Sequence, residues 1–370
     1  MREILISSYA GDAHAAAVLW GLRALGHPAS LWQTREFPAS QALSIAFEPG
    51  QPVRHVIDTD DRSVALDEVG TVWNRRPCPP ALGADVDPRD RDFALGESEQ
   101  HLAGFLATAC PDALWVNPPA ATGLDTNKPH QLRLAREAGF AVPATLFSNA
   151  PDRIAAFFAR HGGNIVYKSY RPQDWREGDD EPVSYTNYTA AVTEQDLGNR
   201  SALAMCPGIF QERIAKAFEL RVTAIGNSFF CVRIDAPESE RARLDWRSER
   251  SAMRLSPFPL PDEVRDKCRS FMKRFGLVFG CFDFIVAPSH QWYFLEVNPM
   301  GQFLWQEERL PELPMLDTMC AFLISADPEF SRAPPSAPLA FADYRKWEVA
   351  ERIRRADAEN RALVEKLVEY

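Results

Sequence analysis

The pattern of hydrophobic and polar positions divides the N-terminal third of the chain into short apolar runs and amphipathic stretches. An apolar run at 4–7 is followed by a helical pattern over 15–25, by a Gly26-His-Pro28 stop signal, and by a second apolar run at 29–32. A strand, a helix and a second strand in this order are typical of a doubly wound sheet. We therefore expect an α/β domain at the N-terminus.

Further segments extend this domain and then end it. Strand patterns over 53–58, 71–74 and 114–116 flank an amphipathic stretch over 93–109, and Asn117-Pro-Pro119 follows the last strand. The loop after the first strand lacks a G-x-G-x-x-G sequence, which argues against dinucleotide binding. We expect the first domain to end near residue 124.

Two runs rich in aromatic and β-branched residues, 280–286 and 292–298, predict a β-hairpin around a Pro-Ser-His turn signal. Side chains of a strand alternate between its faces, so Glu296 and Asn298 share one face. If Ser289 and His290 are the two central turn residues, Asp283 lies opposite Glu296. Two carboxylates and an amide on an apolar hairpin suit Mg²⁺ bound together with nucleotide phosphates. The alternative is a half-exposed hairpin with polar residues in water.

A second predicted hairpin, around Gly226-Asn-Ser228, carries Arg221 and Arg233. With the turn centred on Asn227, the two arginines are equally far from it, and we expect them to face each other across the strands. Two adjacent cations are unfavourable without an anion between them. Salt bridges to neighbouring acidic residues are the alternative.

Other cations stand at the ends of predicted elements. Lys128 begins a helix, where it opposes the helix dipole unless an anion is near, and Lys168 ends a strand that leads into a polar stretch, 169–184, which we interpret as a mobile lid. Both lysines can also be ordinary surface cations. Arg75 and Arg76 follow the strand at 71–74 and can bind a carboxylate or phosphate, or form an exposed basic pair.

Composition narrows the possible partners. The chain has 370 residues, 46% of them hydrophobic, and a formal net charge of -10, which argues against nucleic acid and favours a small or peptidic partner. No apolar run approaches the length of a membrane span and no signal peptide is evident, so we expect a cytoplasmic protein. The seven cysteines form no C-x-x-C pair and are expected to be reduced.

In their order along the chain, these candidate residues resemble the ATP-grasp fold. Residues 125–325 look like an ATP-grasp ligase core and residues 1–124 look like the α/β domain that precedes it. More narrowly, several segments are similar to the ATP-grasp peptide ligases that mature microviridin-type peptides, called graspetides. The segments are 73–77, 166–168, 185–186, 192–193, 218–223, 283–284 and 294–299.

The resemblance implies a role for each candidate residue. Lys128 and Lys168 bind the α- and β-phosphates of ATP, and Glu219 reaches the ribose or the substrate. Arg221 and Arg233 neutralise the transferring phosphoryl group, and Mg²⁺ is held by the carboxylates and the amide. The adenine edge is held through the backbone of four residues: Gln211, Glu212, Arg213 and Ile214.

We expect an ATP-dependent carboxylate ligase. It activates an Asp or Glu side chain of a ribosomal precursor peptide as an acyl phosphate, and a Ser or Thr hydroxyl or a Lys amine of the same peptide then forms a macrocyclic ester or amide. One alternative is a ligase that joins an amino acid to a small acid or to a protein terminus. Another is a nucleotide-binding protein without turnover.

The expected organisation has four parts: 1–124, the N-terminal domain; 125–207, a central lid subdomain; 208–328, the C-terminal subdomain with the metal site; and 329–370, a Pro-rich linker with a helix. Heptad spacing over 349–370 predicts a homodimer, although the helix can equally dock on its own chain. A leader peptide is expected beside the strand at 229–235 and the loop at 236–250, with three candidate acidic partners, unless that loop is simply solvated. They are Glu238, Glu240 and Asp245.

Overall fold

The structure is a computed structural model that describes most of the chain. The described residues are 1–59, 63–123, 127–170, 174–177, 183–186, 188–237, 239, 242, 244–249, 252–332, 337–347 and 349–353. Most of the predicted heptad helix, together with Glu238 and Glu240, therefore lies outside the described residues.

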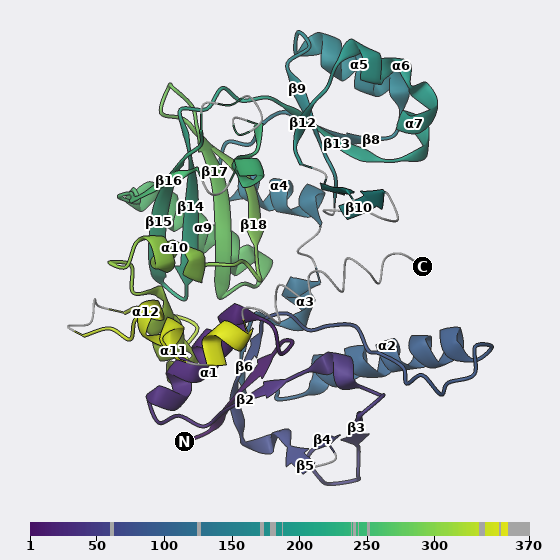
Figure 1. The fold of residues 1–370 in the computed structure, drawn as a ribbon, viewed down its shortest axis with the longest axis vertical. Helices are drawn as coiled ribbons and strands as arrows, with labels where there is room; N and C mark the ends of the chain where they lie inside the picture. The colour runs from purple at the N-terminus through teal and green to yellow at the C-terminus, as the bar shows by residue number, and fades with distance from the viewer. Residues whose placement is uncertain are drawn as a thin grey trace.

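The N-terminal part is a doubly wound sheet, as predicted (Figure 1). Its parallel strands have the order β2 (Ala29–Trp32), β1 (Glu3–Ser7), β6 (Val69–Asn74) and β7 (Leu114–Val116). The apolar side chains of β1 pack against α1 (Ala13–Ala24) on one face and towards α2 (Arg91–Thr108) on the other. The chain reverses its winding direction between β1 and β6, so the carboxyl ends of these two strands form a crevice.

The apolar run at 53–58 does form a strand, but the strand belongs to a separate small sheet. This antiparallel sheet contains β3 (Gln41–Ala46), β4 (Arg54–Thr59) and β5 (Ser63–Ala65), and short 3-10 turns flank it at η1 (Thr34–Glu36) and η2 (Leu66–Glu68). The short helix α3 (Pro119–Thr122) then leads out of the N-terminal sheet.

A second, antiparallel sheet has the order β12 (Ala190–Ala191), β9 (Ile165–Lys168), β13 (Gly208–Glu212) and β8 (Thr145–Ser148). The helices α5 (Pro151–Arg160), α6 (Glu194–Gly198) and α7 (Arg200–Met205) accompany it. Because β13 pairs with both β8 and β9, a division at 207/208 would split this sheet. We place the division in the linker 213–217 instead.

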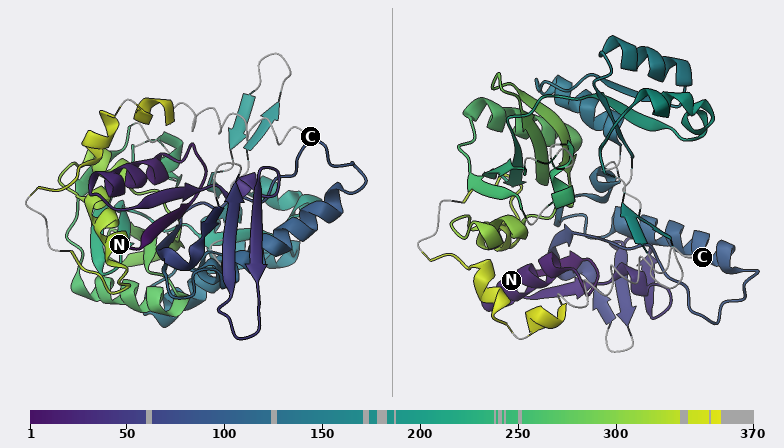
Figure 2. Two further views of the ribbon diagram at one scale, coloured as in Figure 1. Left: turned by 90° about the horizontal axis from the view of Figure 1, so that it is seen from below. Right: turned by 45° about the horizontal axis from the view of Figure 1, so that its top comes forward.

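Where a polar lid was predicted, β10 (Asp174–Glu177) and β11 (Val183–Thr186) form a hairpin that projects from the body (Figure 2).

The third sheet is antiparallel and has five strands. Their order is β16 (Arg254–Pro257), β15 (Ser228–Asp235), β14 (Phe218–Ile225), β17 (Phe279–Val286) and β18 (Trp292–Asn298). One face is apolar, and Phe282, Phe284 and Phe294 pack there against α4 (Lys128–Glu137) and α9 (Asp262–Phe275). Side chains that alternate with these phenylalanines point to the opposite face.

The β17–β18 hairpin places Asp283 opposite Glu296, as predicted, but by a different route. Its loop has five residues, closed by a hydrogen bond from the Ala287 amide to the Gln291 carbonyl (2.9 Å). This loop alone would pair Asp283 with Leu295. A bulge at Leu295 shifts the register by one residue and so brings Glu296 to the face that carries Asp283.

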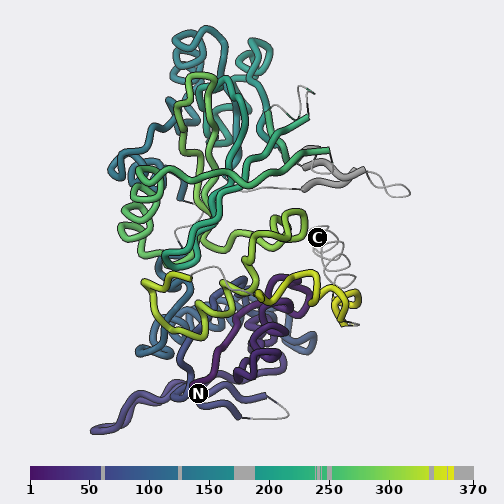
Figure 3. The backbone as a smooth tube through the Cα atoms, turned by 90° about the vertical axis from the view of Figure 1, so that its left-hand side faces the viewer, coloured from purple at the N-terminus to yellow at the C-terminus, as the bar shows by residue number. Residues whose placement is uncertain are grey.

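The C-terminal elements connect the five-stranded sheet with the N-terminal sheet. They are α10 (Leu304–Arg309), α11 (Met315–Ser325) and α12 (Phe341–Arg345), and α11 and α12 lie beside α1 (Figure 3). Glu307 of α10 accepts the amide hydrogens of Leu316 and Phe341, both at 2.7 Å. No helix within the described parts of the chain is long and apolar enough to cross a membrane.

Candidate active site

The candidate site lies on the polar face of the five-stranded sheet, opposite α4 and α9. The Asn298 amide Nδ2 donates to Asp283 Oδ2 at 3.1 Å and to Glu296 Oε1 at 3.3 Å. The three predicted metal ligands are therefore neighbours, and we call them the triad. Rotating the Asn298 amide turns its oxygen towards the two carboxylates. This set of carboxylate and amide oxygens suits a hard divalent cation such as Mg²⁺.

Cations surround the triad. Arg221 Nη1 donates to both oxygens of Asp283 at 2.7 Å, and Lys128 forms an ion pair with Glu296. Burial raises the pKa of Asp283, and the Arg221 charge opposes that rise. Burial also favours a high pKa for Glu296, but the positive charges of Lys128, Arg247 and Lys168 together lower the pKa to about 2. Both carboxylates thus depend on nearby positive charge to stay ionised in a partly buried site.

Lys168 reaches the same site from the four-stranded sheet. Its Nζ donates to Gln211 Oε1 at 2.8 Å, and Gln211 Nε2 donates to Thr145 Oγ1 at 3.0 Å. Burial lowers the pKa of Lys168, whereas the negative charge of Glu296 raises it. Lys168 and Lys128 therefore bring positive charge towards Glu296 from different elements.

The prediction that Arg221 and Arg233 face each other is wrong. The turn of their hairpin has two residues, so Arg221 pairs with Val232 and Arg233 pairs with Leu220. Arg233 consequently lies on the face opposite the triad, where its guanidinium stands 4.0 Å from the centre of the Phe218 ring and donates to Asp235. Arg233 does not lie with the phosphate-binding candidates.

Arg247 is a site residue that the sequence did not reveal. Its hydrogen bond to Asp245 raises the pKa of Arg247, burial opposes this, and the charges of Glu296 and Asp283 add to the rise. Asp245 is only 5% exposed and also accepts hydrogen bonds from Thr189, which argues against its predicted contact with a leader peptide. The loop 236–250 contains four arginines, and nothing in their spacing distinguishes Arg247.

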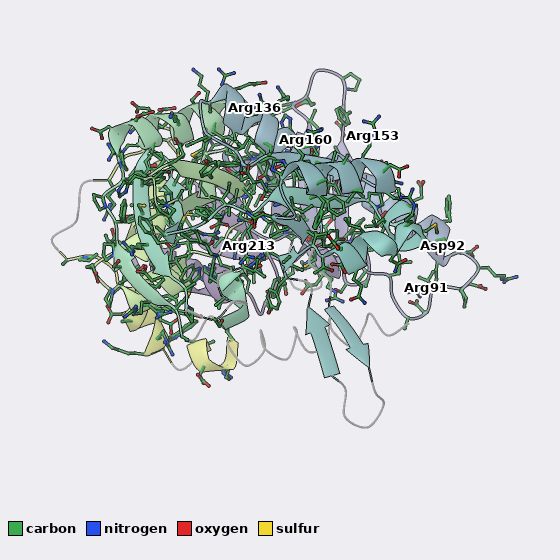
Figure 4. All side chains as sticks on the ribbon, turned by 90° about the horizontal axis from the view of Figure 1, so that it is seen from above. Arg91, Asp92, Arg136, Arg153, Arg160 and Arg213 are labelled. Carbon is green, nitrogen blue, oxygen red and sulfur yellow. The ribbon has the colours of Figure 1, made fainter. Side chains whose placement is uncertain are left out.

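The predicted adenine edge is only partly free to bind a ligand. Arg213, labelled in Figure 4, donates its amide hydrogen to the Asn164 carbonyl at 3.0 Å, and its carbonyl accepts from Asn164 Nδ2. The Glu212 amide hydrogen is bonded to the Ala144 carbonyl at 2.8 Å. Ile214, in contrast, makes no main-chain hydrogen bond with other described residues. Its peptide groups remain candidates for the adenine contact.

Glu219, Arg75 and Arg76 complete the set of predicted site residues. Burial raises the pKa of Glu219, against the opposing charge of Lys216, its ion-pair partner on the same side of the sheet. Arg75 is fully buried between Asp12 (3.2 Å) and the Met300 carbonyl, so it is not an exposed cation, and this burial argues against its predicted role as a substrate ligand. Arg76 is half-buried, and its contact with a substrate carboxylate or phosphate stays a prediction.

Asn117, which the sequence did not single out, joins the N-terminal sheet to the triad strand. Its Nδ2 donates to the carbonyls of Phe279 and Pro299, both at 2.8 Å, and its Oδ1 accepts from the amides of Val278 and Phe279. Pro299 directly follows Asn298. The crevice end of the N-terminal sheet thus fixes the segment that leaves the triad.

Two antiparallel sheets joined by a short linker, with Lys168 on one sheet and a carboxylate–amide triad and Lys128 at the other, define an ATP-grasp ligase. Residues 3–122 match the family model described as the MvdD pre-ATP grasp domain. No curated protein sequence matches the chain.

Solved structures narrow the class. The macrocyclase MdnB from Microcystis aeruginosa MRC shares 30% identity with a TM-score of 0.71, over 88% of this chain and 99% of that one. A Chryseobacterium gregarium RiPP-associated ATP-grasp ligase, in complex with ADP and a leader and core peptide, shares 27% identity with a TM-score of 0.80, over 90% of this chain and 100% of that one. The ligase PsnB, complexed with a precursor variant, Mg and ADP, shares 26% identity with a TM-score of 0.68, over 87% of this chain and 98% of that one. The chain belongs to the ATP-grasp peptide ligases of the microviridin, or graspetide, maturase type.

Proposed function

We propose that the protein uses ATP and Mg²⁺ to form macrocyclic esters or amides within a ribosomal precursor peptide. The observation that carries this proposal is the triad, which lies with Lys128, Lys168 and Arg221 around one partly buried point. The family, and the ADP, Mg and peptides in its solved members, support the same assignment.

The chemistry has two balanced steps. An oxygen of a peptide Asp or Glu carboxylate attacks the γ-phosphorus of ATP, the bond to the β-phosphate oxygen breaks, and ADP leaves. A Ser or Thr hydroxyl, or a Lys amine, then attacks the acyl carbon, loses its proton, and displaces inorganic phosphate. Each ring closure removes the elements of one water molecule from the peptide.

This chain's residues would act mainly by holding charge in place. Lys128 and Lys168 would bind the α- and β-phosphates, and Arg221 and Arg247 would face the transferring phosphoryl group. Mg²⁺, held by the triad, would neutralise the phosphate oxygens. Glu219 would reach the ribose or substrate, Ile214 would offer main-chain groups to adenine, and Arg76 would bind a substrate carboxylate from the N-terminal side.

The test is to incubate the protein with ATP, Mg²⁺ and a panel of microviridin-type precursor peptides, each with and without its leader, and to weigh the products. We expect loss of one or more waters, faster with the leader, because a short reactive segment offers little binding area. Equal dehydration of both forms would remove the leader from the account. Activity only on free amino acids or small acids would favour the small-acid ligase.

A further inference from the structure

Two tryptophans lie beside the triad and have no part in the proposed phosphate chemistry. Trp305 stands in the first turn of α10, just after the segment that leaves Asn298, and Trp246 begins the 3-10 turn η3 (Trp246–Glu249). Their ring centres are 5.7 Å apart and the rings are inclined by 34°. Both side chains remain partly exposed.

Trp305 is connected to the triad through one carbonyl group. Its indole Nε1 donates to the Gln302 carbonyl at 3.1 Å, and the same oxygen accepts from Arg221 Nη2 at 3.3 Å. Arg221 in turn holds Asp283. The Trp305 ring is therefore fixed in place relative to the group that faces the transferring phosphate.

Trp246 is fixed from the other side. The next residue, Arg247, is bonded to the buried Asp245 at 2.6 Å and lies within electrostatic range of Glu296 and Asp283. The two indoles thus come from different elements and meet at the edge of a charged site. A charged site of this kind binds the carboxylate of a substrate but offers its apolar groups little contact area.

We propose that Trp246 and Trp305 form an aromatic platform that holds an apolar side chain of the precursor peptide next to the Asp or Glu that is activated. This inference rests on the proposed function and adds to it a determinant of which acid reacts. Large, rigid aromatic rings give such contact area at low entropic cost. The platform would select an acidic residue by its apolar neighbour, whereas the cations select only the carboxylate.

Replacing each tryptophan by Leu or by Phe distinguishes contact between the aromatic platform and the peptide from the hydrogen bond that Trp305 donates to the Gln302 carbonyl. Phe keeps an aromatic face but lacks the indole N–H, and Leu lacks both. We expect Trp305→Leu and Trp246→Leu to raise KM for the peptide about three- to tenfold, the size of one aromatic contact, with KM for ATP unchanged. Trp305→Phe and Trp246→Phe should stay near the wild type. Trp347→Leu is the matched control, because Trp347 is 38% exposed and packs on Tyr344 of α12.

A peptide pair makes the test specific. For a peptide that the wild type dehydrates, replacing the apolar residue beside the reacting acid by Ala should raise KM for the wild type and leave the Leu variants unaffected. Unchanged peptide KM in both Leu variants would overturn the platform alone. An equal increase of peptide KM in Trp305→Phe and Trp305→Leu would show that only the hydrogen bond from Trp305 to Gln302 matters. A wild type that dehydrates no peptide of the panel would overturn the platform together with the proposed function.

Discussion

At the scale of single residues, the buried ion pair between Asp12 and Arg75 links the crevice of the N-terminal sheet to the Met300 carbonyl. Burial favours a high pKa for Asp12, but Arg75, His14, Arg76 and the Ser8 hydroxyl together lower it to about 2 from 3.8. A lowered carboxyl pKa stabilises the folded state above the unfolded pKa, and this contribution is lost as the pH falls from about 4 to about 2.

We therefore expect Asp12→Asn to lower the free energy of unfolding by about 3 kcal/mol at neutral pH, since it leaves the Arg75 charge buried and unpaired. The difference from the wild type should shrink by roughly 2 kcal/mol as the pH approaches 2. Urea denaturation at a series of pH values measures this. The exposed Asp343→Asn variant is the control, and a difference that stays constant with pH would contradict the assignment.

The arginines show how far residue-level reasoning reaches. The sequence identified the hairpin and Arg221, but a turn one residue shorter than expected moved Arg233 to the opposite face. Arg247 carries no local signal, because its place depends on how the loop 236–250 packs over the sheet. The face of the sheet on which a strand residue lies can be predicted from strand alternation, provided that the length of the turn is predicted correctly. The position of a residue that is held by tertiary contacts cannot be predicted in this way.

At the scale of elements, the bulge at Leu295 decides which face carries Glu296. Deleting Leu295 should remove the bulge yet leave Glu296 opposite Asp283, because every residue after the deletion moves up by one position, whereas inserting one Ala after Leu295 should carry Glu296 past Asp283. We expect the insertion variant to lose both turnover and thermal stabilisation by ADP with Mg²⁺, and the deletion variant to retain both. Normal turnover in the insertion variant would show that the register of β18 does not place Glu296.

This hairpin also marks a limit of the sequence analysis. The pairing of Asp283 with Glu296 was predicted from a two-residue turn, yet it arises from a longer loop plus a bulge, two deviations that cancel. Apolar periodicity predicted many of the strands and helices, including β2 at its observed bounds. It could not show that the strand at 53–58 belongs to a separate sheet, because sheet membership depends on distant pairing partners.

At the scale of the whole molecule, Asn117 fixes the N-terminal sheet to the triad strand through hydrogen bonds to Val278, Phe279 and Pro299. Removing its side chain leaves several buried peptide groups unsatisfied, each costing about 1–3 kcal/mol. We expect Asn117→Ala to lower the free energy of unfolding by at least about 3 kcal/mol. Chemical denaturation measures it. Asn149→Ala, which alters an exposed side chain on the second sheet, is the control, and an unchanged midpoint for Asn117→Ala would refute this role.

The central claim is that a peptide carboxylate is activated by phosphorylation at the triad. The direct measurement uses a precursor peptide whose Asp and Glu carboxylates carry ¹⁸O, with analysis of the phosphate released during ring closure. Attack on the γ-phosphorus and later cleavage at the acyl carbon transfer one carboxylate oxygen, so we predict one ¹⁸O per phosphate for each bond formed. Glu296→Gln should release labelled phosphate on the order of 100- to 1000-fold more slowly, whereas Glu263→Gln, on the exposed side of α9, should behave as the wild type. Ring closure that yields unlabelled phosphate would contradict the account.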